Sequence, residues 1–138
     1  MQTARNLMTP HPATVRVDAT IRDAAHLFET STVRHLPVVD KEGTLVGMLS
    51  DRDLHGVVLP RFTQPEHASE FRDVFSASVA TIMSGNVISV GEEATARHVV
   101  GVMLENKIGA VPVVNRRGAL VGIVSYIDVL RQLPMYED

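Results

Sequence analysis

The apolar and polar positions of the chain predict short strands that alternate with helices. Residues 36–39 and 44–49 are apolar runs of strand length, and the polar tetrapeptide DKEG between them is typical of a β-hairpin turn. Between positions 21 and 28 the apolar residues recur instead at the spacing of one helix face. Asp18 or Thr20 is the expected N-cap of that helix. The pattern therefore predicts a helix followed by a hairpin.

The same pattern occurs a second time along the chain. Residues 36–47 align without a gap with residues 111–122, an offset of 75 residues (111 minus 36). The match extends over nearly all of residues 5–58 and 79–133. The turn glycine Gly43 of the first copy corresponds to Gly118 of the second. Glycine can adopt a positive φ in such a turn. Each copy is predicted to contain a strand, a helix, two hairpin strands and a second helix.

The first strand of each copy departs slightly from this alignment. Residues 14–17 resemble residues 87–90 best, at an offset of 73 (87 minus 14). On this comparison Val15 of the first copy corresponds to Ile88 of the second. The prediction therefore includes a compensated shift of two residues between the first strand and the rest of each copy.

One copy is too small to exclude water from the apolar face of its own short sheet. We therefore expect an α+β fold of two βαββα-type repeats, packed sheet to sheet as a pseudo-twofold pair with a cleft on either side of the internal axis. The expected division is residues 1–59 for repeat 1, residues 60–78 for a helical linker and residues 79–138 for repeat 2. Within the linker, residues 65–75 are predicted to form an amphipathic helix that bridges the copies or meets a partner subunit.

Composition narrows the functional classes. The 138 residues have a net charge of −3 and no long basic run, which argues against a nucleic-acid partner or a membrane-surface patch. Cysteine is absent, so disulfides, thiolate metal sites and cysteine nucleophiles are excluded, and the six histidines show no ligand spacing. No apolar run approaches the length of a membrane span. We therefore expect a cytoplasmic protein without a metal site and without a membrane partner.

Each hairpin ends in a serine that an aspartate follows three positions later, as Ser50 and Asp53 and again as Ser125 and Asp128. One interpretation is a capping box, in which both side chains satisfy free N–H groups at a helix start. The other is a nucleoside site, because one carboxylate can accept hydrogen bonds from both ribose hydroxyls. A helix start with a serine hydroxyl also stabilises a phosphate. The two interpretations are compatible with one another.

Adenine is flat and mostly apolar, so it suits a slot between apolar side chains. Backbone groups beside Pro37, or beside its counterpart in the second copy, could read the polar edge of the base. The candidate residues around this slot are Val15, Leu36, Pro37, Ile88, Ala110 and Val111.

Several of these motifs resemble those of a known family. The Met8-Thr9-Pro10 segment, the LPVVD segment from Leu36 to Asp40, the serine–aspartate ends and their tandem repetition resemble the cystathionine-beta-synthase (CBS) domain pair, or Bateman module. The resemblance covers almost the whole chain. It implies a regulatory module without catalytic activity that requires no cofactor, binds AMP, ADP, ATP or S-adenosylmethionine in its clefts, and commonly forms a homodimer. Because no catalytic or membrane segment accompanies the pair, we expect a stand-alone member.

The resemblance also implies roles for the residues ahead of the first proline. In nucleotide-binding relatives, basic residues at this place contact the phosphate of a ligand whose ribose is held by the aspartate of the opposite copy. Carried over, Arg34 and His35 would serve the site anchored by Ser125 and Asp128. Arginine is always charged, whereas histidine would contribute only partly at neutral pH. Arg34 and His35 therefore become candidate phosphate contacts.

The second site is expected to differ. Ser50 and Asp53 would meet Gly109 and Ala110, which offer no charge, so this site would prefer a less anionic adenosyl ligand or stay empty. Other interpretations remain open. Arg34 and its neighbour can equally be a solvated loop end, and the module can be a ligand-free dimer that docks on a partner protein through its helices.

Overall fold

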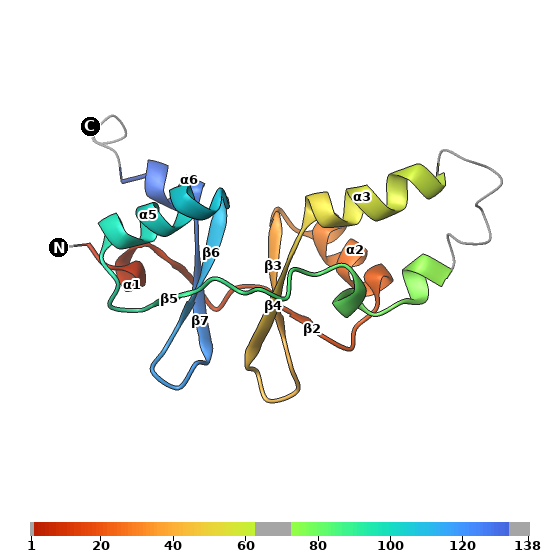
Figure 1. The fold of residues 1–138 in the computed structure, drawn as a ribbon, viewed down its shortest axis with the longest axis horizontal. Helices are drawn as coiled ribbons and strands as arrows, with labels where there is room; N and C mark the ends of the chain where they lie inside the picture. The colour runs from red at the N-terminus through yellow and green to blue at the C-terminus, as the bar shows by residue number, and fades with distance from the viewer. Residues whose placement is uncertain (1, 63–72, 133–138) are drawn as a thin grey trace. The chain divides into compact units, whose positions relative to one another are not determined.

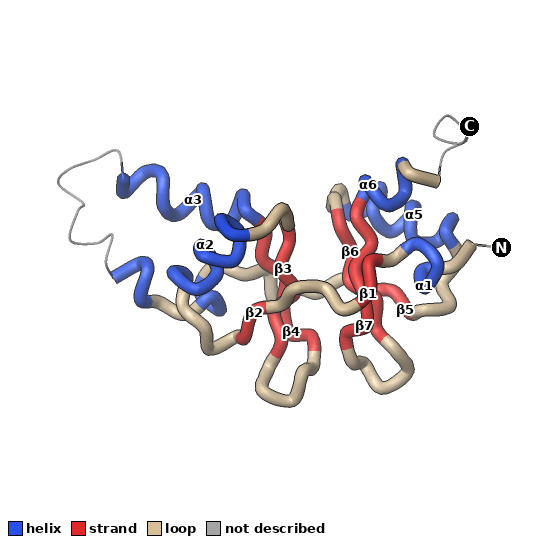
Figure 2. The backbone as a smooth tube through the Cα atoms, turned by 180° about the vertical axis from the view of Figure 1, so that it is seen from behind, coloured by secondary structure: helices blue, strands red, loops and turns tan. Residues whose placement is uncertain are grey.

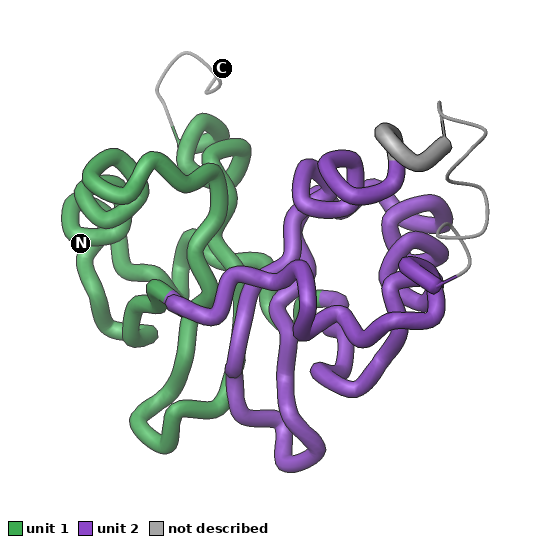
Figure 3. Tube along the Cα trace, turned by 45° about the vertical axis from the view of Figure 1, so that its right-hand side comes forward, with its two compact units in different colours: residues 1–12, 88–138 green, residues 13–87 purple. Residues whose placement is uncertain are grey.

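The structure is a computed structural model that describes residues 2–62 and 73–132, with the side chains of residues 59–62 left aside. The chain divides into two compact units (Figure 3). Unit 1 contains Met1–Pro12 and Ile88–Asp138, and unit 2 contains Ala13–Val87. Apart from residues 1–12, unit 2 therefore holds the first repeat, and apart from residues 79–87, unit 1 holds the second.

Unit 2 is built on a three-stranded sheet in the order β2-β3-β4. Its elements are β2 (Val15–Arg16), α2 (Ile21–Thr30), β3 (His35–Val39), β4 (Leu45–Ser50) and α3 (Asp51–Phe62). Strand β2 runs parallel to β3, and β3 runs antiparallel to β4. In Figure 1 the two helices lie on one face of this sheet. The predicted order of strand, helix, hairpin and helix is confirmed.

Unit 1 repeats this arrangement and adds one strand. Its elements are α1 (Ala4–Leu7), β1 (Thr9–Pro10), β5 (Val90–Gly91), α5 (Ala96–Asn106), β6 (Ala110–Val114), β7 (Leu120–Ser125) and α6 (Tyr126–Leu130). The sheet order is β1-β7-β6-β5 (Figure 2). The β6–β7 hairpin carries the same bulge position as β3–β4, since the register shifts between Val113 and Val114 and between Val38 and Val39. The α+β class with two repeats is confirmed.

Local chemistry explains where these elements begin and turn. Gly43 and Gly118 have φ of 84° and 80°, a region that residues with a Cβ rarely occupy, so glycine allows both hairpin turns. The Thr20 hydroxyl accepts the Asp23 N–H at 3.1 Å and caps α2, while Thr95 caps α5. Hydrogen bonds from Thr20 lower the pKa of Asp23. Of the two expected caps for α2, Thr20 is the one used.

The offset of 73 expected for the first strand is wrong. Val15 pairs with Val38 and Val90 pairs with Val113, so Val90 is the counterpart of Val15, 75 residues away (90 minus 15). Both valines are 4% exposed. A shift of two residues leaves every side chain on the same face of a strand, so the apolar alternation alone cannot distinguish the two registers. The pairing with the neighbouring strand decides between them.

Each unit has a hydrophobic core of its own, and the two cores use equivalent positions. In unit 2 the fully buried residues include Leu36, Val38, Leu49 and Val79. Each of these has a counterpart in unit 1 that is 75 positions away in the sequence and is also buried. The counterparts are Val111, Val113, Val124 and Ala4. Burying a side chain of this size contributes roughly 1.5–3 kcal/mol relative to exposure. The sequence repeat is therefore a repeat of core packing.

The short segments at the start of each repeat, residues 4–10 and 79–84, are exchanged between the two repeats. We call them the leader segments. Thr9 in the first pairs with Ile123 of β7 in unit 1, and Ser84 in the second bridges to Met48 of β4 in unit 2. Each repeat in sequence therefore supplies its leader to the sheet of the other.

The predicted helix over residues 65–75 lies largely outside the described residues. Residues 73–76 are helical, and a 3₁₀ turn follows at Val79–Thr81. Within the described part of the chain, no helix is both long enough and apolar enough to span a bilayer.

Candidate ligand site

The serine–aspartate pairs form capping boxes at the starts of α3 and α6. The Ser50 N–H donates to Asp53 Oδ2 at 2.8 Å, and the Asp53 N–H donates to Ser50 Oγ at 3.2 Å. In unit 1 the same two bonds join Ser125 and Asp128 at 2.8 and 3.3 Å. The capping interpretation is confirmed in both repeats.

The caps use only one oxygen of each carboxylate. Asp53 Oδ2 accepts the Ser50 N–H, and no other described group is bonded to Oδ1 of this half-buried side chain. In unit 1, Asp128 Oδ2 accepts both the N–H and the hydroxyl of Ser125. Because a carboxylate offers about four lone-pair positions, each cap fixes the aspartate while leaving acceptor capacity for a ligand. A cap and a ribose contact are therefore compatible at the same residue.

Asp128 has one further contact that sequence reasoning missed. The hydroxyl of Thr9, on the leader strand β1, donates to Asp128 Oδ1 at 3.4 Å, a long hydrogen bond. The two residues are 119 positions apart, and only the exchange of the leader brings them together. No local motif signals a contact of this range.

In unit 2 the strand register brings four predicted residues to one corner. His35 pairs directly with Ser50 across β3 and β4, and the Asp51 N–H donates to the Arg34 carbonyl at 3.0 Å. Since Asp53 is fixed to Ser50 by the cap, the basic pair and the acidic helix start lie together. Their assignment to the site of the other repeat's aspartate stays a prediction.

The equivalent corner of unit 1 is uncharged ahead of its proline. Ala110 pairs directly with Ser125, and the Tyr126 N–H donates to the Gly109 carbonyl at 3.0 Å. The backbone geometry therefore matches that of unit 2, while the side chains of Arg34 and His35 have no counterpart here. The expected difference in ligand preference between the two sites stays a prediction.

The two basic residues of unit 2 have different electrostatic states. Arg34 is 74% exposed, and its Nη1 lies 3.4 Å from Asp51 Oδ2 in an ion pair that solvent screens. His35 is half-buried, and burial lowers the pKa of its imidazole, with the carboxylates of Asp51 and Asp53 opposing the shift. The charge of Arg52 also lowers this pKa. At neutral pH the fixed positive charge of this corner therefore belongs to Arg34 and Arg52, and His35 is a neutral hydrogen-bonding ring.

The predicted apolar residues are mostly part of the cores. Leu36 and Val111 are fully buried among the core side chains of their own units, Val15 is 4% exposed, and Ile88 packs partly buried against the unit 1 core. Pro37 is also fully buried, and Ala110 is 5% exposed. Residues that fill a core have little surface left for a ligand, so the structure assigns these positions mainly to packing.

The first residues of β3 have a paired strand on one side only. Strand β2 pairs only with Val38 and Val39, so within the described residues no strand lies beside His35, Leu36 and Pro37 on that side of β3. Strand β5 likewise pairs only with the end of β6. Leu36 and Pro37 are nevertheless fully buried, and His35 is the partly exposed residue of this stretch.

Within the part of the chain that the structure describes, no group of three or more His, Asp or Glu side chains is placed to hold a metal ion. The candidate site therefore consists of hydrogen-bonding groups, a carboxylate and, in unit 2, a guanidinium group.

The two units repeat one arrangement of strands and helices, and each has an aspartate held in a helix cap. The sequence profile of the CBS domain matches residues 4–59 and 79–134. The chain belongs to the CBS domain family. It is 26% identical over 126 residues to a CBS domain-containing protein of Dictyostelium discoideum, covering 91% of this chain and 87% of that protein.

Solved structures of CBS pairs are also similar. One is CBSX2 in complex with AMP, with a TM-score of 0.81, 27% identity and full coverage of both chains. Another is the CBS domain pair of protein MJ0100 in complex with 5-methylthioadenosine and S-adenosyl-L-methionine, with a TM-score of 0.76, 27% identity and coverage of 95% and 94%.

In other curated relatives the chain spans a smaller part of a longer protein. It covers 23% of an inosine-5'-monophosphate dehydrogenase of Aquifex aeolicus, to which it is 28% identical over 126 residues. CBS pairs similar to this chain therefore occur both as nearly whole proteins and as parts of enzymes.

Proposed function

We propose that this chain is a regulatory module that binds an adenosine-containing ligand, namely AMP, ADP, ATP or S-adenosylmethionine, and has no catalytic activity of its own. The observation that carries the proposal is the capped aspartate in each repeat, whose cap uses one carboxylate oxygen and leaves acceptor capacity on the other. The similarity to CBS pairs solved with AMP and with S-adenosyl-L-methionine supports the class of ligand.

In this proposal Asp53 and Asp128 accept hydrogen bonds from ribose hydroxyls, and backbone groups beside the buried prolines contact adenine. Arg34 supplies the charge for a phosphate, with neutral His35 as a hydrogen-bond partner, and both serve the ligand anchored by Asp128. The site of Asp53 then takes the less anionic ligand, because Gly109 contributes no charge to it.

A binding role fits the state of the serine hydroxyls better than catalysis does. Ser50 Oγ accepts the Asp53 N–H, and Ser125 Oγ accepts the Asp128 N–H while donating to the Asp128 carboxylate. An activated serine nucleophile instead donates to a general base positioned by a third group. The serines therefore act as helix caps in this proposal, and the signal arises from differential affinity for alternative arrangements of the protein.

We include a homodimer, a regulated protein target and a cytoplasmic location in the same proposal. Support for protein contacts comes from large apolar side chains on the helices of unit 1: Leu104, Tyr126, Ile127 and Leu130 are 73%, 55%, 41% and 39% exposed. Exposed apolar groups of this kind are typical of interaction surfaces when they gather on one face.

Isothermal titration calorimetry with AMP, ADP, ATP and S-adenosylmethionine tests the ligand assignment. The informative variants are Asp53→Asn and Asp128→Asn, because an amide oxygen can still cap the helix while the charge that binds ribose is lost. Glu105→Gln, an exposed position on α5, is the matched control. We expect each Asp variant to lose one class of ligand. Unchanged binding in both would overturn the site, and no binding by the wild-type protein would overturn the function.

A further inference from the structure

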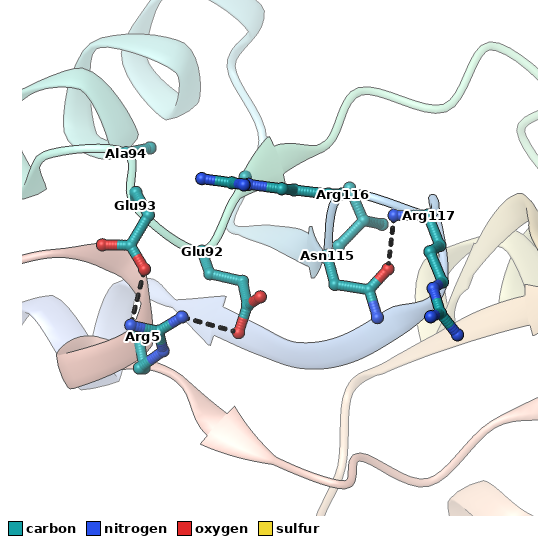
Figure 4. A pocket seen from close by; sticks show the side chains of 9 residues that line it. Arg5, Glu92, Glu93, Ala94, Asn115, Arg116 and Arg117 are labelled. Carbon is teal, nitrogen blue, oxygen red and sulfur yellow. Dashed lines mark hydrogen bonds and ion pairs between the residues drawn. The ribbon is translucent and has the colours of Figure 1, made fainter.

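Unit 1 contains a cavity of about 660 Å³ (Figure 4). It lies at the end of strand β6 that is farther from Ser125. The loop of residues 91–94 and the Arg5 side chain form one wall, and residues 114–117 form the other. Ala110 begins β6 beside Ser125, whereas Val114 ends it at this cavity. The cavity is therefore separate from the site proposed above.

The charges of the first wall are already paired with one another. Arg5 Nη2 lies 3.2 Å from Glu92 Oε2, and Arg5 Nη1 lies 2.5 Å from Glu93 Oε1. One guanidinium group thus bridges two carboxylates, and Figure 4 shows the two contacts as dashed lines. The hydrogen bond to Glu92 and the charges of both glutamates raise the pKa of Arg5. This wall offers a ligand little unsatisfied positive charge.

The second wall carries hydrogen-bond donors without partners. Asn115 Oδ1 accepts the N–H groups of Arg117 at 2.9 Å and Ala119 at 3.0 Å, which fixes the amide so that its NH₂ group is left to donate. Neither Arg116 nor Arg117 has an ion-pair partner among the described residues. In Figure 4 the Arg116 side chain extends toward the segment that carries Glu92. The Arg117 side chain extends in a different direction from that of Arg116, so the two guanidinium groups lie at different places along the cavity edge, and the Asn115 amide belongs to the same wall.

The fold itself does not require this arrangement, because unit 2 lacks it. The equivalent residues lie 75 positions away in the sequence: Ala80 for Arg5, Val17 for Glu92, Asp40 for Asn115, Lys41 for Arg116 and Glu42 for Arg117. Lys41 lies 4.0 Å from Glu42, so the corresponding cation has an acidic neighbour. Since both units have the same fold, the fold does not require the unpaired arginines of unit 1.

We propose that this cavity binds a small molecule through an oxyanion, a phosphate or carboxylate group, held by Arg116, Arg117 and the Asn115 amide. A guanidinium group forks onto two oxygens of either group, and charge-assisted bonds of this kind are the strong ones. The cavity lining contains three arginines and two glutamates, a net charge of +1 (3 minus 2), which favours an anion. Its volume falls within the range of roughly 300–1,000 Å³ for small-molecule sites.

The test is an NMR titration of the full chain with inorganic phosphate, against sodium chloride at equal ionic strength. We expect saturable shifts of the backbone amides of residues 91–94 and 115–119 with phosphate alone. The double variant Arg116→Ala/Arg117→Ala should weaken the response at least tenfold. Lys41→Ala, the matched change in the turn of unit 2, should leave it intact.

The proposal would be overturned by no saturable response, by equal responses to chloride and phosphate, or by an undiminished response in the double variant. Both arginines are exposed and their side chains bond no described residue, so the double variant is expected to fold, which its thermal unfolding midpoint checks. The Asp128→Asn variant separates the two sites, since it should lose nucleoside binding and keep the phosphate response of this cavity. A phosphate response that disappears in Asp128→Asn would assign the anion to the other site and overturn this one.

Discussion

The Met8 side chain occupies the space directly above Gly122. A Cβ atom built on Gly122 would lie 2.2 Å from the Met8 sulfur and 3.0 Å from the Met8 Cβ. Unit 2 has the same relationship between Met83 and Gly47, where the sulfur would lie 2.4 Å away. A glycine is required three positions before each serine–aspartate motif because the methionine of a leader segment packs against it. Both leader segments make this methionine–glycine contact.

This relationship predicts that Gly122→Ala destabilises the protein. Because the new methyl group meets the Met8 Cβ as well as its flexible end, the leader must move, at a cost of about 1–3 kcal/mol. Met8→Ala should itself destabilise, and the combined variant should be less unstable than the sum of the two. The free energy of unfolding from urea titrations of all four proteins gives the coupling.

Gly101→Ala is the control for this experiment. Gly101 lies within α5, and a Cβ built there meets nothing within 4 Å. Replacing glycine by alanine in a helix interior should stabilise by about 0.5–1 kcal/mol. Equal effects of the two glycine substitutions, or strict additivity of Gly122→Ala and Met8→Ala, would contradict the packing described here.

The sequence predicts much of this fold because most of it is determined locally. The hairpin turns at Gly43 and Gly118 and the helix cap at Thr20 depend on residues within four positions of one another, which a sequence pattern records. The twofold repeat of apolar positions likewise identifies Leu36 and Val111 as equivalent, and both are core residues.

What the sequence could not predict depends on long-range pairing. The exchange of the leaders, the Thr9–Asp128 contact and the cavity beside Arg5 all join segments that are far apart in the sequence. The register of the first strands failed for a related reason, since Val15 and Val90 are matched only through their partners on β3 and β6. The serine–aspartate motif is visible in the sequence, but it suits both a helix cap and a ribose site, so the sequence does not decide between these roles.

Protonation of His35 should make stability depend on pH. Burial lowers the pKa of His35 in the folded state, so between its ordinary value of about 6.5 and the lower folded value the unfolded chain binds more protons. The free energy of unfolding therefore decreases as the pH falls below about 6.5, and titration of His35 does not change it at higher pH. Urea unfolding from pH 7.5 to pH 5 should show this slope in the wild type and a smaller slope in His35→Gln. Identical slopes would contradict the assignment.

Replacing Arg34 should affect ligand binding more than folding. Its exposed ion pair with Asp51 contributes little, so Arg34→Ala should change the free energy of unfolding by about 0.5 kcal/mol or less. Loss of a charge-assisted hydrogen bond to phosphate should weaken AMP or ATP by roughly tenfold to a hundredfold and leave adenosine unchanged. Isothermal titration calorimetry measures the affinities for AMP or ATP and for adenosine, and Arg97→Ala, an exposed position on α5, is the control. Equal weakening of AMP and adenosine would show that Arg34 does not contact the phosphate.

The two roles of the serine–aspartate motif can be separated by substituting its members one at a time. Ser125→Ala removes the hydroxyl that accepts the Asp128 N–H, so it should destabilise α6 and cost about 1 kcal/mol of folding stability. The Asp128 carboxylate still accepts the Ser125 N–H in this variant, so ribose binding should persist with a modest loss. Asp128→Asn should show the opposite pattern, because its amide oxygen can cap the helix but a neutral group binds two hydroxyls more weakly. Thermal unfolding and calorimetry on both variants would reveal this crossed pattern, and parallel losses in both properties would mean that the aspartate serves the fold alone.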